Sequence, residues 1–344
     1  MKLMDKAKQA ALAAAVKTGL GYLEKDPEVN IPKLMELVDK FVPDGWYESQ
    51  RNAIRNAIQN KDSNWYKLIL RIYELDPGVR EAFFTNFIIN ASLKGSALQE
   101  ETAEENNCNV PWAILLDPTS ACNLHCTGCW AAEYGHKLNL TFDEMDKVVT
   151  QGKELGVYLY MFTGGEPLVR KADLVKLCEK HSDCAFLAFT NGTLVDEAFC
   201  ADLKRIGNLY LAISLEGFSE VNDLRRGTGV FAKVMHAMDL LKENGLVFGT
   251  SICYTSKNYK TVTSDDFIDM IVEKNNMHDF DSSMFFRWMF KSAFAILIVT
   301  NTWNIVMGIF DVGQSVVNSS AGVIIGNTSI DISSVITDME AQLE

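Results

Sequence analysis

Short apolar segments alternate with amphipathic ones between residues 113 and 274, and this alternation constrains the fold more than any other feature of the chain. The apolar segments predict strands at 113–116, 158–162, 185–189, 209–214 and 247–254. The amphipathic segments predict helices at 142–155, 171–180, 197–206, 231–244 and 264–274. Strands that alternate with helices form a parallel sheet with covered faces. Five units in a row predict an α/β fold, a (β/α) barrel or part of one, with its working groups at the C-terminal ends of the strands.

Three cysteines follow the first predicted strand, spaced Cx3Cx2C: Cys122, Cys126 and Cys129. Iron–sulfur cubes are normally held by four thiolates, so three thiolates on one loop would leave one iron open to another ligand. A zinc site is the alternative, although zinc sites usually combine two cysteine pairs and the chain has no second pair. His125 is expected to be a solvated loop residue rather than a ligand.

The loops after the next strands carry further polar groups. Gly164 and Gly165 lack side chains, so a ligand could approach the backbone, and Glu166 beside them suits an ammonium group. Ser214 and Glu216 lie two apart, face the same side of a strand and could hydrogen-bond a ribose diol. Arg225 or Arg226 offers a forked partner for a carboxylate. An ammonium, a carboxylate and a ribose together describe S-adenosylmethionine.

Cx3Cx2C after the first strand and Gly-Gly-Glu after the second resemble the radical S-adenosylmethionine (SAM) superfamily, over about residues 111–277. The resemblance implies that the three cysteines ligate a [4Fe–4S] cluster. It implies that Gly164, Gly165 and Glu166 hold the amino end of SAM, Ser214 and Glu216 the ribose, and Arg225 or Arg226 the carboxylate. Within the superfamily, residues 111–134 and the helical N-terminal region look most like the branch with the hopanoid-biosynthesis adenosyltransferases.

The activity implied by the resemblance is reductive cleavage of SAM to a 5′-deoxyadenosyl radical, which abstracts a hydrogen or adds to a double bond. The implied partners are a small-molecule, lipid or peptide substrate and an electron donor such as flavodoxin or ferredoxin. No protein general base is required, so no catalytic residue beyond the cluster and SAM is expected. One alternative is a non-catalytic iron–sulfur protein, which explains the cysteines but leaves the glycine, ribose and arginine loops unused. The other is a chimeric or truncated membrane-anchored protein in which the barrel is a relic.

Charge and cysteine usage narrow the class of protein. The formal net charge of −13 argues against nucleic acid as a partner, because affinity for phosphates depends on clustered Lys and Arg. Five of the eight cysteines are scattered, which is typical of buried thiols in a reducing compartment. The N-terminal stretch is charged and amphipathic rather than a signal peptide, so a cytoplasmic location is expected.

Residues 1–99 are predicted to be a helical region, with helices at 5–23, 31–41, 47–58, 65–75 and 79–93. The polar, acidic residues 100–110 predict a linker, and the radical SAM core is expected at 111–280. The helical region contains no ligand set or phosphate loop and is expected to be a cap or docking module.

Residues 281–344 form an apolar tail in which the strand–helix alternation stops. Ser292 to Phe310 is uncharged over 19 residues, long enough to cross a bilayer and equally suited to a buried helix with a break. Residues 297–317 and 321–325 are similar to the integral membrane subunit of conjugative type IV secretion systems. We therefore expect a chimeric chain whose tail is of foreign origin, with membrane association through residues 285–310. Without a sixth strand, the barrel edge is expected to be unpaired.

Overall fold

Five parallel strands form the centre of the protein, as the alternation predicts. The computed structural model describes residues 26–41, 48–61, 66, 70, 72–129, 131, 135, 137–253 and 255–274, and also 18, 21, 297–300, 324–325 and 328–329. The sheet in this part of the chain has the order β1-β2-β3-β4-β5-β6. Its parallel strands are β1 (Ala113–Leu116), β2 (Leu159–Phe162), β3 (Ala185–Thr190), β4 (Leu209–Ser214) and β5 (Phe248–Ile252). Sequential parallel neighbours of this kind make an α/β fold with part of a barrel, as expected.

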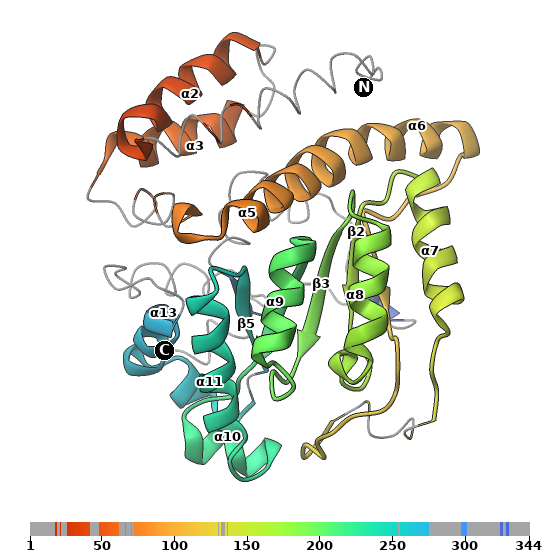
Figure 1. Ribbon diagram of the computed structural model, residues 1–344, viewed down its shortest axis with the longest axis vertical. Helices are drawn as coiled ribbons and strands as arrows, with labels where there is room; N and C mark the ends of the chain where they lie inside the picture. Colours follow the sequence, from red (N-terminus) through yellow and green to blue (C-terminus); the bar gives the residue numbers. More distant parts are fainter. Residues whose placement is uncertain are drawn as a thin grey trace.

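The crossover helices cover one face of this sheet (Figure 1). They are α7 (Phe142–Glu154), α8 (Lys171–Lys180), α9 (Glu197–Ile206) and α11 (Val230–Glu243). A capping box starts α7: Glu144 accepts the backbone N–H of Thr141, and the Thr141 hydroxyl accepts the N–H of Glu144. Two shorter elements lie between these helices, η4 (Pro167–Arg170) and α10 (Ser219–Arg226). After β5 come α12 (Tyr259–Val262) and α13 (Asp265–Lys274).

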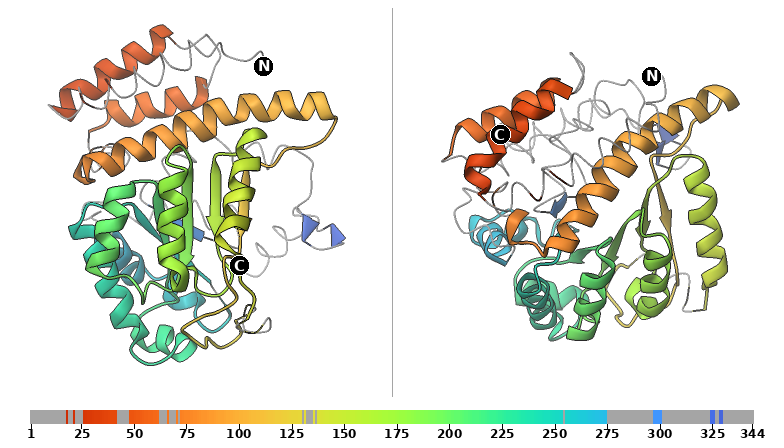
Figure 2. Two further views of the ribbon diagram at one scale, coloured as in Figure 1. Left: turned by 45° about the vertical axis from the view of Figure 1, so that its right-hand side comes forward. Right: turned by 45° about the horizontal axis from the view of Figure 1, so that its top comes forward.

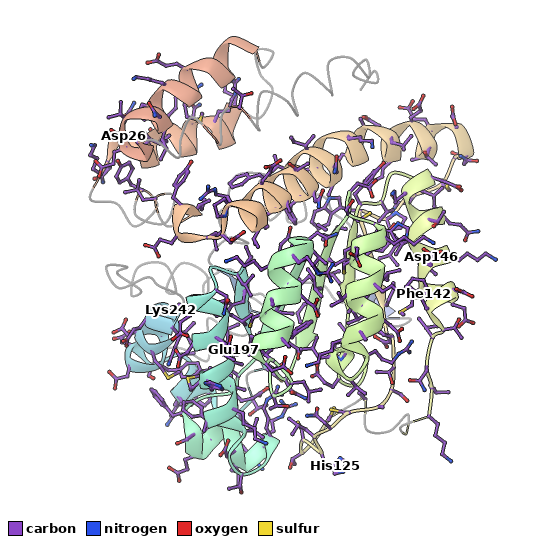
Figure 3. The ribbon with its side chains drawn as sticks, viewed as in Figure 1. Asp26, His125, Phe142, Asp146, Glu197 and Lys242 are labelled. Atoms are coloured by element: carbon purple, nitrogen blue, oxygen red, sulfur yellow. The ribbon has the colours of Figure 1, made fainter. Side chains whose placement is uncertain are left out.

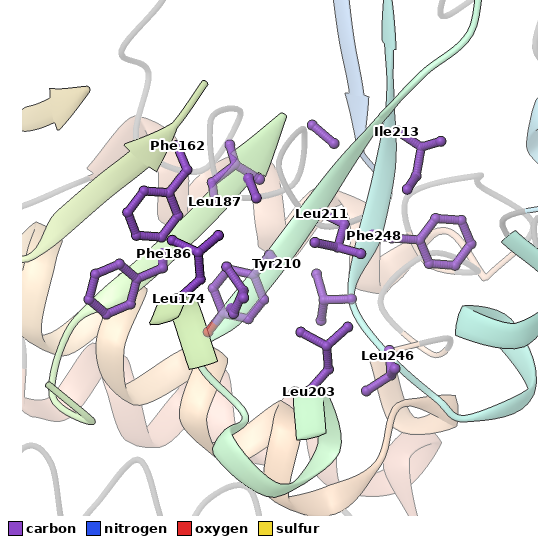
Figure 4. Packing of buried hydrophobic residues seen from close by; sticks show 14 of the residues in the cluster. Phe162, Leu174, Phe186, Leu187, Leu203, Tyr210, Leu211, Ile213, Leu246 and Phe248 are labelled. Carbon is purple, nitrogen blue, oxygen red and sulfur yellow. The ribbon is translucent and has the colours of Figure 1, made fainter. Parts of the chain in front are cut away.

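The core lies between the sheet and these helices (Figure 4). Tyr160 and Phe162, two apart on β2, both stack on Phe186 of β3, with ring centroids 5.6 Å apart in each case. The Tyr160 hydroxyl donates to the carbonyl of Val149 in α7, so this face of β2 points toward the helices. By alternation, the neighbouring residues Leu159 and Met161 face the opposite side of the sheet.

One continuous helical stretch lies across the N-terminal ends of the strands (Figures 1 and 2). It consists of α5 (Pro77–Phe83), the π-helix η2 (Phe84–Gly95) and α6 (Ser96–Asn106). Side-chain amides of this stretch donate to backbone carbonyls just before two strands. Gln99 donates to Gly156 before β2 at 2.8 Å, and Asn86 donates to Ser182 before β3 at 2.9 Å. Residues 100–106, expected to be a linker, are therefore helical. They lack an apolar period, but Glu, Gln and Ala favour helix and the preceding turns nucleate it.

Two earlier helices precede this stretch, α2 (Pro27–Phe41) and α3 (Glu48–Gln59), followed by a short turn η1 (Ile72–Glu74). Ile31 of α2 and Ile58 of α3 form a small cluster separate from the main core. The helix expected at 5–23 lies outside the described residues except for residues 18 and 21. Of the helix expected at 65–75, residues 65, 67–69 and 71 lie outside them, and 72–74 form η1.

The predicted unpaired barrel edge is wrong. A sixth strand, β6 (Leu297–Thr300), pairs antiparallel with β5, from Gly249 opposite Thr300 to Ile252 opposite Leu297. Sequence reasoning missed it because it lies in the apolar run 292–310, where periodicity cannot separate a strand from a helix. The tail also contributes β7 (Ile324–Ile325) and β8 (Thr328–Ser329), a two-stranded antiparallel pair.

Most of the segment 285–310 proposed to enter a membrane lies outside the described residues. Within the described part of the chain, every helix is too short or too polar to cross a bilayer.

Candidate functional site

The three cysteines of the Cx3Cx2C motif lie on the loop that leaves β1, at the C-terminal edge of the sheet. Cys122, Cys126 and Cys129 are free thiols of intermediate burial. Figure 3 labels His125 within this loop, at the end of the molecule opposite α5 and α6. The loop turns back on itself, since the N–H of Cys129 donates to the carbonyl of Cys126 at 3.2 Å.

The Gly-Gly-Glu turn after β2 holds the first part of this loop. The N–H of Gly165 donates to the carbonyl of Thr119, and that of Glu166 to the carbonyl of Ala121, both at 2.8 Å. A Cβ on Gly165 would overlap the Ala121 carbonyl oxygen, and Gly164 has a φ of +97°. The two glycines are thus required for the close approach of the turn to the cysteine loop, a reason that the sequence did not show.

Glu166 is buried, with 1% of its surface exposed. Its Oε1 accepts from the Thr190 hydroxyl at 2.6 Å and the Leu168 N–H at 2.9 Å, and its Oε2 accepts from the Asn191 N–H at 2.7 Å. Burial raises the pKa of this carboxyl, while the three donors act in the opposite direction. Both oxygens therefore accept hydrogen bonds within the chain, and the contact of this carboxylate with an ammonium group stays a prediction.

Two further segments hold the rest of the cysteine loop. The Asn123 side chain donates to the Thr193 hydroxyl at 2.8 Å and accepts from the Asn191 amide at 2.8 Å, which joins the loop to the turn after β3. The N–H of Thr127 donates to the carbonyl of Arg225 at 2.8 Å, which joins it to α10. The cysteine loop is thus bonded to the turns after β2 and β3 and to the helix after β4.

Arg170, which sequence reasoning missed, stabilises the entry to the loop. Its Nη1 donates to the carbonyls of Pro118 and Leu140, at 3.0 and 2.8 Å, while Nε donates to Asp173 at 2.7 Å. The sequence alone does not indicate this role, because the carbonyl partners of Arg170 lie on loops whose positions the sequence does not give.

Glu216 and the two arginines, predicted as separate contacts to one ligand, are bonded to each other. Oε1 of Glu216 accepts from Nη1 of Arg225 at 2.6 Å and from Nη2 of Arg226 at 2.5 Å. Glu216 is 1% exposed, so a buried carboxylate is bonded to two partly buried guanidinium groups. The structure brings together all three predicted residues beside the cysteine loop.

Two pairs of polar side chains at this edge were not predicted. Ser214 at the end of β4 lies in register with Ser251 of β5, so two hydroxyl groups come from adjacent strands. Asp117 after β1 accepts a hydrogen bond from the Thr163 hydroxyl after β2 at 2.5 Å. Sequence reasoning missed both pairs because the sequence alone does not fix which residues of neighbouring strands lie side by side.

The thiols have the environment expected of buried sulfur donors. Burial raises the pKa of Cys122 and of Cys126, and for Cys126 the nearby Arg226 and Arg225 act in the opposite direction. The N–H of Leu124 donates to Sγ of Cys122 at 3.4 Å. Among the described residues, no three His, Cys, Asp or Glu side chains converge on a single ion position. A cube does not need such convergence, because each thiolate binds a different iron, so three soft donors on one loop fit a [4Fe–4S] cluster.

Comparisons with known proteins divide the chain in two. The family model of the Radical SAM superfamily matches residues 116–271, from the end of β1 into α13. The model described as TrbL/VirB6 plasmid conjugal transfer like protein matches residues 260–344, so the two matches overlap between 260 and 271.

Individual relatives are similar over part of their length. Fe-coproporphyrin III synthase of Methanosarcina barkeri is 28% identical over 166 residues, which cover 47% of this chain and 41% of the relative. PqqA peptide cyclase of Bradyrhizobium diazoefficiens is 32% identical over 127 residues, 36% of this chain and 33% of the relative. The matches thus span less than half of either curated relative. The solved structure of Streptococcus suis SuiB bound to precursor peptide SuiA has a TM-score of 0.45, with 19% identity, 51% of this chain and 40% of that chain covered.

Proposed function

Because residues 116–271 match the Radical SAM superfamily, we propose that this chain contains a radical SAM enzyme core that reductively cleaves S-adenosylmethionine. The observation that carries the proposal is the cysteine loop itself. Three free thiols are held at the C-terminal edge of a parallel sheet by hydrogen bonds to the loops after β2, β3 and β4. Working groups of such sheets gather at this edge.

In this proposal Cys122, Cys126 and Cys129 bind a [4Fe–4S] cluster. When bound, such a cluster would supply the one electron that cleaves a C–S bond of SAM to give methionine and a 5′-deoxyadenosyl radical. The chain's own contribution is to hold the thiols in place. Gly164 and Gly165 allow the turn after β2 to contact the loop, and Glu166 fixes that turn to β3.

The SAM-binding groups are proposed to lie on β4, β5 and α10. Ser214 and Ser251, adjacent in register, supply two hydroxyl groups for the ribose. Arg225 and Arg226 supply guanidinium groups for the carboxylate. The amino end of SAM would lie against backbone groups near Gly164 and Gly165 and beside Glu166, whose carboxylate is held in place by three donors.

The substrate is proposed to be a small molecule, a lipid or a peptide, and the electron donor a flavodoxin or ferredoxin. A peptide is supported by the PqqA peptide cyclase relative, a small molecule by the Fe-coproporphyrin III synthase relative. A substrate would approach the face of the sheet away from α7 and α8, where Leu115 is 54% exposed beside the Asp117 carboxylate.

The test is anaerobic reconstitution of the full chain with iron and sulfide, followed by dithionite and SAM. We expect bound iron and sulfide and formation of 5′-deoxyadenosine. Cys126→Ala should lose the cluster and the product, whereas the matched variant Cys108→Ala, at an exposed thiol outside the loop, should keep both. A cluster without 5′-deoxyadenosine would favour a non-catalytic iron–sulfur protein, and retention of the cluster in Cys126→Ala would contradict the ligand assignment.

We also propose that the chain is a chimera of a radical SAM core and a conjugal-transfer tail. The observation in favour is the second family match, which begins at residue 260. Sequencing the locus across codons 255–290, together with the transcript, tests the idea. Separate reading frames in independent reads would contradict a genuine fusion.

A further inference from the structure

The cluster of Glu216, Arg225 and Arg226 has an unbalanced charge. It contains two guanidinium groups and one carboxylate, and both arginines donate to the same oxygen, Oε1 of Glu216. Arginine remains charged in proteins, so the cluster carries one excess positive charge. A second carboxylate would balance it.

The hydrogen bonding of this cluster is also incomplete. Among the described residues, Oε2 of Glu216 and Nε of Arg226 are buried and have no hydrogen-bond partner. Buried polar groups are normally paired, and an unpaired one carries a free-energy cost. One free acceptor on the carboxylate and one free donor on Arg226 indicate that the Glu216–Arg226 pair can form more bonds than it has.

The backbone of Glu216 is held on both sides. The N–H of Glu216 donates to Oδ1 of Asn222 at 3.1 Å, and its carbonyl accepts from Nδ2 of Asn258 at 3.0 Å. Asn222 and Asn258 are themselves 0% and 4% exposed. The backbone is thus fixed on both sides, so a change of partner requires side-chain rotation alone.

The two arginines differ in access. The Arg225 side chain is 24% exposed and that of Arg226 is 10% exposed. The carbonyl of Arg225 accepts from the Thr127 N–H, which lies between Cys126 and Cys129. The guanidinium of Arg225 is therefore the more accessible of the two to a ligand.

We propose that Glu216 is an internal competitor for the carboxylate of SAM. When SAM binds, Arg225 transfers from Glu216 to the SAM carboxylate, and Glu216 stays paired with Arg226. The exchange gives two carboxylates for two guanidinium groups. This inference rests on the proposed function and replaces the predicted contact between Glu216 and the ribose.

The test measures equilibrium binding to the reconstituted full chain with two unreactive probes. S-adenosylhomocysteine has the amino-acid carboxylate, whereas 5′-methylthioadenosine has the same nucleoside without it. Glu216→Gln removes the competing charge, so it should tighten S-adenosylhomocysteine about tenfold and leave 5′-methylthioadenosine unchanged. Glu220→Gln, at an exposed carboxylate on α10, the helix that carries the two arginines, is the matched control and should change neither affinity.

Arg225→Gln provides a second variant at a more exposed position, should Glu216→Gln fail to fold. It should weaken S-adenosylhomocysteine about tenfold, again without effect on 5′-methylthioadenosine. If Glu216→Gln instead weakens both probes equally, Glu216 contacts the nucleoside and the competition is refuted. Unchanged binding of S-adenosylhomocysteine in either folded variant also refutes it. Absence of 5′-deoxyadenosine from the wild-type chain is a separate result, which refutes the proposed function.

Discussion

Gly165 has no room for a side chain, because the carbonyl of Ala121 in the cysteine loop occupies the position that a Cβ would take. The residue types of the candidate site could be predicted from their places after the strands: thiols, glycines, hydroxyls and charges. Their partners could not. Glu166 bonds to the turn after β3 and Glu216 to the arginines of α10, since each partner depends on which loops lie side by side at the edge of the sheet.

Gly165→Ala should therefore displace the cysteine loop. We expect a folded protein that binds much less iron after reconstitution, because the Gly165–Thr119 and Glu166–Ala121 bonds cannot both form beside a methyl group. Iron and sulfide analysis, with circular dichroism for folding, measures the effect. Gly21→Ala is the control, since a Cβ there meets no atom within 4 Å. Full iron content in Gly165→Ala would contradict this role.

At the scale of elements, the five parallel strands and the crossover helices are close to their predicted bounds, because apolar strands and amphipathic helices differ in period. The exceptions have local causes. The helix α10 is short and polar, and its residues were expected to be a strand-end loop carrying Arg225 and Arg226. The helix α6 has no apolar stripe, and β6 lies in an apolar run without a strand period.

Capping of α9 gives a prediction at this scale. Asp196 accepts the Phe199 N–H at 2.8 Å and pairs with Lys171 at 2.6 Å. Asp196→Ala should lower the free energy of unfolding by about 1 kcal/mol, as loss of an N-cap does. Asp196→Asn should lower the free energy of unfolding much less, because an amide oxygen still caps the helix and the exposed ion pair contributes little. Urea unfolding compares the two, and equal losses would contradict the capping role.

The pH dependence of this cap follows from the sign of the shift. The hydrogen bond from Lys171, followed by that from Phe199, lowers the pKa of Asp196 below its ordinary value of 3.8. The contribution of Asp196 to the free energy of unfolding is therefore complete above its ordinary pKa. It is lost as the pH falls through the lowered pKa of the folded state. Between neutral and strongly acidic pH, the free energy of unfolding should fall more in the wild type than in Asp196→Asn. If the two proteins lose the same amount over this pH range, the ionised Asp196 does not contribute to stability in this way.

At the scale of the whole molecule, the stretch α5–η2–α6 covers the end of the sheet opposite the candidate site. Phe83 and Phe87 are 3% and 1% exposed and stack on each other, and Phe83 also packs edge-on against Tyr210 of β4. This arrangement could not be predicted, because the amphipathic pattern of a helix identifies its apolar face but not the part of the sheet that it meets.

Phe83→Ala should lower the free energy of unfolding by about 3–5 kcal/mol, since it removes a buried ring and leaves a cavity. Leu224→Ala, at a side chain 79% exposed, should change it by less than about 0.5 kcal/mol. Denaturant unfolding, followed by near-ultraviolet circular dichroism, measures both. If Phe83→Ala changes the free energy of unfolding as little as Leu224→Ala does, packing of this helix on the sheet does not stabilise the protein.

The position of this helical stretch in the chain has a consequence for synthesis on the ribosome. Residues 77–106 leave the exit tunnel before any strand of the sheet, yet the ring of Phe83 is covered by Tyr210, more than a hundred residues later. Throughout that interval the nascent chain exposes an apolar helix face that has no partner, a state prone to aggregation. Nascent chains released before β4 should therefore bind holdase chaperones, and chains that include β4 should be released from them.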